Sequence, residues 1–434
     1  MSEVSLEEVI SEEAFAELLH GQSEMFFRLA NTLLKRADTQ WSRRHYFQLT
    51  SEADTLEAFL DDYGARHNRT YHVFRELTAS ARGFGLAGLS ITHLVRRLDS
   101  YGTAFSGEGA AEAKAAIESS KEFVQGVLVT LLESIRDEAD RCDLRPTDAG
   151  FPEDLYGSTA PRLSLPRNVG QEDIEDEEQK VAEVVSKYLQ ACEMFGALGV
   201  RQIDDPKERE VYLSQNCSEE QARVYEATVH NLQSVYDTYI KNTRLESKDE
   251  RLSKLRGHAS AALHMLEAVT HLTHFVERHE GGMRHDEADR KIETLVSKAE
   301  VRHVTLNHLL FWASRFMQEG RALAEDLLPS YTNVQLLEAQ LPDDLLLHAR
   351  PAALIVGIVN HYGTPVELEV EGHTCNAGSI LELMVAVGSN PSAKRYTFRG
   401  DENPLRDIAL LFEHNLGEDG ISGLPDQLDY LKNR

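Results

Sequence analysis

Hydrophobic and polar residues recur with a helical period through most of the first 330 residues. In "FFRLANTLLKRADTQW", four apolar residues lie on one side of a helix: Phe27, Leu29, Leu33 and Leu34. "ALHMLEAVTHLTHFVERH" has the same spacing, and Gly281-Gly282 closes it. Proline breaks helix interiors, and between residues 167 and 328 it occurs only at Pro206. This part of the chain is therefore predicted to be α-helical, with no sheet of its own.

From about residue 333 the pattern changes to short strands that alternate with helices. "VELEV" at 366–370 alternates with a period of two, and Glu371-Gly372 turns the chain into a hairpin. "KRYTF" reads as another strand, and "ENPLRDIALLFEHNLG" as a helix with Asn403 as its N-cap. Pro351 and Gly363 bracket a further helix, which is predicted from about Ala349 to Tyr362.

Proline spacing also sets the predicted domain boundaries, because four prolines fall between residues 146 and 166. The expected class is an α+β multidomain protein, in which two mostly helical regions precede a C-terminal α+β domain. The predicted segments are a helical domain at 1–142, a proline-rich linker at 143–171, a second helical domain at 172–330, the α+β domain at 333–420 and a tail at 421–434.

The two helical regions share a faint internal similarity. Residues 69–97 align without gaps to residues 250–278, which matches Arg75 to Arg256 and Thr92-His93 to Thr273-His274. Amphipathic helices resemble one another by chance, so duplication and coincidence both remain open.

Composition excludes several classes of function. The formal net charge of −27 argues against nucleic acid and anionic membrane as partners, because both need a basic surface. There is no apolar run of about 18 residues, so no membrane insertion is expected. The four cysteines have no CxxC spacing, and the acidic N-terminus lacks the basic start of a signal peptide, so a reducing cytoplasm is expected. "GFGLAG" lies within a helical pattern and is not interpreted as a nucleotide site.

His348 and Arg350 lie one residue apart where the helix between Pro351 and Gly363 is predicted to begin. A helix N-terminus presents unpaired N–H groups and the positive end of the helix dipole, so it binds anions. A neutral imidazole there can act as a nucleophile, and Arg350 can fork onto the oxygens of a phosphoryl group on its ring. The simpler alternative is an exposed histidine beside an exposed arginine.

The segment "LLLHARPAAL", followed by helix, hairpin, helix, strand and helix, resembles the phosphocarrier protein HPr of the sugar phosphotransferase system over about residues 333–420. The resemblance implies an open-faced β-sandwich, a four-stranded antiparallel sheet with three helices on one face. It also implies His348 as phosphoryl acceptor and Arg350 as phosphate stabiliser. There are two departures: Leu346 stands where the family has a glycine, and one extra residue lies between Ser379 and Gly388. The implied partners are a phosphoenolpyruvate-dependent donor enzyme and downstream acceptor proteins, with no cofactor and no turnover of the carrier itself.

Ser379 stands where the resemblance implies a regulatory serine, which a dedicated kinase phosphorylates in the family. Ser379-Ile-Leu-Glu382 also has the form of a capping box that opens a short helix. The following helix offers Ile380, Leu381 and Met384 as an apolar patch for partner docking. A serine that only caps its helix remains the alternative.

A second cluster lies in the helical region, where five residues recur along one helical stripe: His264, Glu267, His271, His274 and Glu277. With His303 or His308 such a stripe can supply metal ligands inside a bundle, but a solvated or hydrogen-bonded face explains the same spacing, and no metal is expected.

Phosphoryl acceptance on His348, used for sugar transport or signalling, is therefore the leading function. One alternative is a regulatory or scaffold protein whose helical region is the working part and a candidate surface for self-association. A metal-binding bundle is the other.

Overall fold

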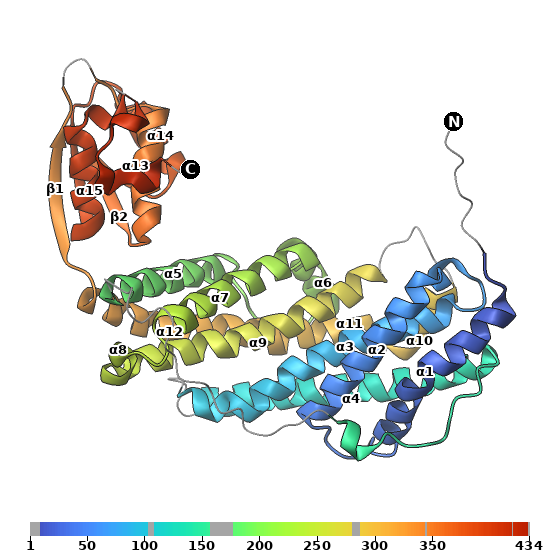
Figure 1. Cartoon of the computed structure of the whole chain (residues 1–434). Helices are drawn as coiled ribbons and strands as arrows, with labels where there is room; N and C mark the ends of the chain where they lie inside the picture. The colour runs from blue at the N-terminus through green and yellow to red at the C-terminus, as the bar shows by residue number, and fades with distance from the viewer. Residues whose placement is uncertain are drawn as a thin grey trace, which may run out of the picture. The chain divides into compact units, whose positions relative to one another are not determined.

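The computed structural model describes residues 9–102, 108–156, 177–279, 287–342, 345–418 and 420–432. It is mostly helical and ends in a four-stranded antiparallel sheet with helices, so the predicted α+β multidomain class is confirmed (Figure 1). Much of the predicted linker and the Gly281-Gly282 helix end lie outside the described residues. Within those residues no helix is long and apolar enough to cross a membrane.

The chain forms two compact units, each built from three segments. One unit comprises Met1–Leu165, Leu198–His230 and Gly257–Met317; the other comprises Pro166–Ala197, Asn231–Arg256 and Gln318–Arg434. The domain boundaries inferred from proline spacing stay a prediction.

The helices before the sheet run from α1 to α12 and include one π-helical segment. Their bounds are α1 Glu12–Leu34, α2 Arg43–Asp62, α3 His72–Arg97, α4 Glu108–Arg141, α5 Glu177–Ala197, α6 Pro206–Asn216, α7 Glu219–Tyr239, α8 Arg244–Lys248, α9 Glu250–Arg278, α10 Glu287–Leu295, α11 Lys298–His303, the π-helical Val304–Leu310 and α12 Phe311–Leu327. Short 3₁₀ turns lie at Ala65–His67, Leu98–Tyr101, Glu153–Leu155 and Leu328–Ser330.

Side-chain caps explain several of the helix starts. Ser11 accepts a hydrogen bond from the Ala14 N–H at the start of α1, and Asp205 accepts two from the first turn of α6. Each such cap satisfies backbone donors that the helix itself leaves unpaired.

The two arginines matched by the internal alignment make the same contact. Arg75 of α3 forks onto Asp61 near the end of α2, with Nε–Oδ1 and Nη2–Oδ2 distances of 2.7 and 2.6 Å. Arg256 of α9 forks onto Asp237 near the end of α7, at 2.5 and 2.9 Å. The arginines lie at matched positions, but Asp61 and Asp237 precede them by 14 and 19 residues, so the bidentate pairs leave both duplication and coincidence open.

The sheet has the strand order β1-β4-β2-β3, and every neighbouring pair is antiparallel. Its strands are β1 Val334–Gln340, β2 Val366–Val370, β3 His373–Asn376 and β4 Arg395–Asp401. The predicted hairpin joins β2 and β3, and its turn residues Glu371 and Gly372 have φ values of 49° and 81°. This left-handed backbone is the one that a two-residue hairpin loop requires.

Three helices accompany the sheet: α13 Ala349–Tyr362, α14 Ile380–Ser389 and α15 Glu402–Glu413 (Figure 1). The range of α13 is the predicted one, and Gly363 ends it with φ 68° and an N–H bonded to Val359. The predicted N-cap of α15 was wrong, because Asp401 and not Asn403 precedes the helix. Pro404 then lies in the first turn, where its missing N–H costs little.

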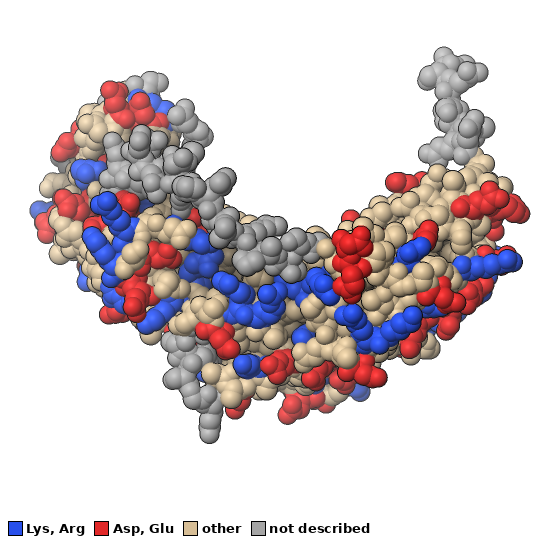
Figure 2. All heavy atoms as spheres, turned by 60° about the horizontal axis from the view of Figure 1, so that its bottom comes forward, with Lys and Arg blue, Asp and Glu red and all other residues tan. Residues whose placement is uncertain are grey.

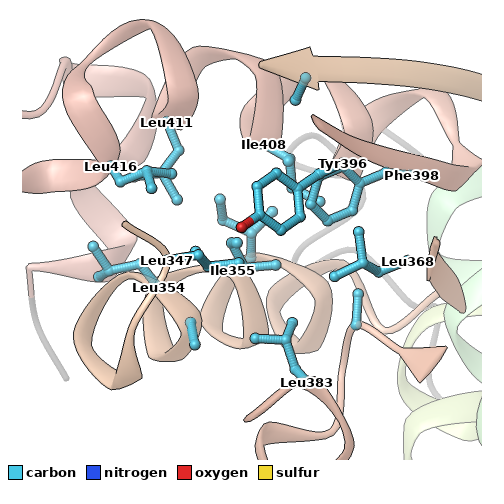
Figure 3. Close-up of a cluster of buried hydrophobic side chains, with 14 of the residues drawn as sticks. Leu347, Leu354, Ile355, Leu368, Leu383, Tyr396, Phe398, Ile408, Leu411 and Leu416 are labelled. Carbon is cyan, nitrogen blue, oxygen red and sulfur yellow. The ribbon is translucent and has the colours of Figure 1, made fainter. Parts of the chain in front are cut away.

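The helices and the inner face of the sheet enclose one hydrophobic core. Figure 3 shows the rings of Tyr396 and Phe398 above Ile355 and Leu368. Residues 366–370 alternate between buried and exposed, as their sequence predicts. The core continues past residue 420, because Leu424, Leu428 and Leu431 join it from the 3₁₀ turns Ile421–Gly423 and Asp426–Leu431.

Candidate functional site

His348 is the N-cap residue of α13. Its backbone is extended (φ −127°, ψ −172°), and its carbonyl accepts the N–H of Ala352 at 3.0 Å, the first bond of the helix ladder. Pro351 has no N–H to offer, so the N–H groups of Ala349 and Arg350 remain outside that ladder. Slightly more than half of the His348 side chain (53%) is exposed. The ring therefore lies at an accessible helix N-terminus.

The two ring nitrogens of His348 have different surroundings. Nδ1 faces the backbone N–H of Arg350 at 3.4 Å, and Nε2 lies 3.0 Å from Glu418 Oε1. This carboxylate oxygen is buried and makes no hydrogen bond within the described residues, so the approach to Nε2 is an ion-pair distance without hydrogen-bond geometry. An N–H donor facing Nδ1 and a carboxylate facing Nε2 together favour the neutral tautomer with its proton on Nε2.

A strained turn brings Glu418 to the histidine. Asn415, Leu416 and Gly417 have φ values of 51°, 55° and 72°, so three consecutive residues are left-handed after α15 ends. Such backbone is costly for residues other than glycine, and here the fully buried Leu416 side chain anchors it. The same turn places the Gly417 carbonyl 3.5 Å from Arg350 Nη2. One turn thus meets both predicted site residues.

This arrangement suits a nucleophile that receives an anionic group. Nδ1 carries the lone pair, and the N–H groups of Ala349 and Arg350 lie at the positive end of α13. Among the described residues, the exposed Arg350 side chain has only a long contact to a carbonyl. Sequence reasoning missed Glu418, which lies seventy residues beyond His348 (418 minus 348) and outside any motif. Only the strained turn reveals it.

Ser379 is the N-cap of α14, as the sequence predicts. Its hydroxyl accepts the N–H of Glu382 at 3.4 Å, a long cap bond. The reciprocal half of the predicted capping box is wrong. Glu382 Oε2 accepts the N–H of Asn376 at 3.0 Å, because the Ser379 N–H already bonds to the Asn376 carbonyl.

The predicted docking residues lie on α14 with different exposure. Ile380 and Leu381 are exposed, whereas Met384 packs partly against the core. Val385, which the sequence did not single out, is exposed on the same helix, and Leu346 is exposed two residues before His348. Exposed large apolar side chains at such density on one short helix are typical of an interaction surface.

Basic and acidic side chains are mixed on one face of the molecule. On the face that Figure 2 shows, groups of basic side chains are interspersed with acidic ones, although the net charge is −27. The net charge therefore does not determine the electrostatics of any one site, which depend on the local contacts.

The histidine stripe of α9 contacts carboxylates and other rings in the part of the chain that the structure describes. Within the described residues no three His, Cys, Asp or Glu side chains are placed to hold an ion. His264 contacts Glu267 at 2.9 Å, and His274 contacts Glu219 at 2.7 Å. Burial, together with nearby Arg82, lowers the pKa of His271 to about 4, so this ring is neutral. The rings of His303 and His308 meet edge to face, with centroids 5.0 Å apart.

Comparison with known proteins agrees with the geometry at the C-terminal end. Residues 338–389 match the family model described as the PTS HPr component phosphorylation site, and the region before them matches no family model. Searches among curated proteins and among solved structures gave no match. This match supports a phosphocarrier-type role in the phosphotransferase system and interaction with its phosphotransfer proteins. Residues 338–389, which include His348 at the start of α13, are therefore similar to the phosphorylation-site region of the HPr family.

Proposed function

We propose that His348 accepts a phosphoryl group on Nδ1 from a phosphoenolpyruvate-dependent donor enzyme and passes it to an acceptor protein. The observation that carries this proposal is the asymmetry of the ring, in which Nδ1 faces the helix N-terminus and Nε2 faces Glu418. Glu418 acts as a positioning residue, because it favours the Nε2 proton and leaves the lone pair on Nδ1.

Binding of the phosphoryl group uses groups that the free domain leaves available. The Arg350 N–H passes from Nδ1 to a phosphoryl oxygen, and the Arg350 guanidinium exchanges the 3.5 Å contact to Gly417 for a fork onto the same group. The new N–P bond forms on Nδ1 as the donor's bond to phosphorus breaks, and the Nε2 proton stays in place.

Partner docking is assigned to the apolar residues of α14. Ile380 and Leu381 supply exposed apolar area, with Met384 at the edge of the patch. Ser379 lies directly before them, and a phosphoryl group there would place close to two negative charges beside the patch. We assign to a serine kinase the role of weakening the docking of an acidic partner, without unfolding α14, because the helix dipole favours a dianion at its N-terminus.

The test uses the full-length chain, phosphoenolpyruvate and a donor enzyme of the phosphotransferase system. Phosphopeptide mapping at alkaline pH should locate phosphate on His348. His348→Ala should lose it, and His361→Ala, at the other end of α13, should keep it. Failure to label His348, or equal labelling of His348→Ala, would leave the domain as an interaction module without carrier function.

A further inference from the structure

Four histidines of the described residues have a carboxylate close to one ring nitrogen. The pairs are His264–Glu267, His274–Glu219, His279–Asp289 and His348–Glu418, at 2.9, 2.7, 2.9 and 3.0 Å. The exposed fractions of the histidine side chains are 17%, 39%, 2% and 53% in the same order. A ring that receives a group from another protein must be accessible, so His274 is the one that shares both properties of His348.

The surroundings of His274 fix its tautomer. Nδ1 lies 2.7 Å from Oε2 of Glu219, the first residue of α7, and Arg223 binds the other carboxylate oxygen with Nε and Nη2 at 3.0 and 2.6 Å. Partial burial opposes ionisation of Glu219, but the hydrogen bonds from His274 and Arg223 outweigh it and lower its pKa. The carboxylate of Glu219 holds the imidazole proton on Nδ1, which leaves the lone pair on Nε2.

Nothing in the described part of the chain uses that lone pair. His274 Nε2 has no hydrogen-bond partner there, and the Arg223 side chain is largely exposed, so its guanidinium can turn towards a group bound at Nε2. The constellation of histidine, orienting glutamate and arginine therefore occurs twice. At His348 a glutamate lies 3.0 Å from Nε2, and Nδ1 faces the helix N-terminus. At His274 a glutamate is hydrogen-bonded to Nδ1, and the lone pair is on Nε2.

We propose that His274 is a second phosphoryl acceptor, which takes the group from phosphorylated His348; this rests on the function proposed above. The bond from His274 Nε2 to phosphorus forms as the bond from His348 Nδ1 breaks. Both rings begin and end the step with one proton on the nitrogen that faces glutamate, so no proton is gained or lost and no co-reactant is needed.

The neighbouring charges predict how long the group stays. Arg223 favours a dianion at His274, whereas Glu219 and Glu277 oppose it; Glu277 is held close by the Glu219 N–H at 2.8 Å. Two carboxylates against one arginine make the phosphorylated state of His274 short-lived. A site of this kind passes its group on or reports briefly on the state of His348.

The first experiment tests His274 without any enzyme. The full-length chain is incubated with phosphoramidate, which phosphorylates accessible imidazoles, and labelling is followed by peptide mapping. His274 should be labelled about tenfold faster than His230, which is exposed and has no carboxylate partner within the described residues. Glu219→Gln should remove most of this advantage. His230→Asn is the matched control and should leave the labelling rate of His274 unchanged. Circular dichroism confirms that each variant is folded. Equal rates at His274 and His230 would overturn the proposal, whatever happens at His348.

The second experiment tests transfer. With phosphoenolpyruvate and the donor enzyme, the wild-type chain should carry phosphate on both histidines, His274→Asn on His348 alone and His348→Ala on neither. The group on His274 should give the ³¹P signal of the Nε2 isomer, distinct from that of Nδ1. Phosphate on His348 alone would refute the second site and leave the proposed function standing. A chain that stays unlabelled at His348 would instead refute the proposed function and, with it, the transfer step.

Discussion

Replacing Arg350 should destabilise the phosphorylated state of His348 without changing the stability of the unphosphorylated domain. This side chain is exposed, and within the described residues its one hydrogen-bond contact is 3.5 Å from Nη2 to the Gly417 carbonyl. That distance is too long for a good hydrogen bond, so Arg350→Ala should change the free energy of unfolding by less than about 0.5 kcal/mol. The effect should appear only when the phosphoryl group is present.

The magnitude follows from two parallel N–H···O bonds to the phosphoryl group. Hydrogen bonds to charged groups are worth roughly 1.5–3 kcal/mol each, so losing both raises the free energy of the phosphorylated state by about 3 kcal/mol or more. At about 1.4 kcal/mol per factor of ten, the equilibrium constant for phosphorylation falls about 100-fold. Arg350→Lys keeps the positive charge but loses the bidentate geometry, so the equilibrium constant for phosphorylation should fall about tenfold.

The assay measures the occupancy of His348 at equilibrium over a series of phosphoenolpyruvate-to-pyruvate ratios. His361→Ala, on the same helix but at its other end, serves as the control and should match the wild type. Equal occupancy of His348 by phosphate in the wild type, Arg350→Lys and Arg350→Ala would refute the role of Arg350. A large loss of stability in unphosphorylated Arg350→Ala would show instead that the residue supports the fold.

Three further outcomes are expected. Ser379→Ala should lower the free energy of unfolding by about 1 kcal/mol or less, because its cap bond is long, whereas Ser379→Asp should keep the cap and slow the phosphorylation of His348; equal rates in both variants would leave Ser379 as a cap alone. Leu381→Glu, at a side chain that is 73% exposed, should raise the KM for the donor enzyme with little change in melting temperature, and an equal effect from Val334→Glu on β1 would contradict docking on α14. Burial lowers the pKa of His258 to about 4 from an unfolded value near 6.5, so its contribution to stability is present above pH 6.5 and is lost as the pH falls towards 4; urea denaturation of His258→Gln should show a shallower loss between pH 7 and 5, and an unchanged slope would disprove this source.

The sequence predicts the local elements well where one signal dominates. Pro351 and Gly363 bracket α13, and the alternation of "VELEV" with Glu371-Gly372 predicts β2 and its hairpin. The predicted start of α15 was wrong because Asn403-Pro404 is a strong N-terminal signal, yet the helix begins directly after Asp401. The Asp401 side chain makes no cap hydrogen bond, and its carboxylate accepts the Asn333 N–H instead. Competing capping residues within three positions are not resolved by local preference.

The candidate site was predictable only as far as its motif reaches. His348 and Arg350 stand in one short segment, so both could be named from the sequence. Glu418 is far from His348 in the sequence, and a left-handed turn brings it to the ring. Neither Asn415 nor Leu416 indicates this turn in the sequence. His274 was visible as part of a stripe, but the partner that fixes its ring is Glu219 on α7, and no spacing rule connects the two helices.

The most direct test of the central claim is the ³¹P NMR spectrum of the full-length chain after phosphorylation by phosphoenolpyruvate and the donor enzyme. The account predicts a resonance of the Nδ1 phosphohistidine isomer, which disappears in His348→Ala and remains in His361→Ala. A spectrum without the Nδ1 isomer, or one in which that resonance survives in His348→Ala, would contradict it.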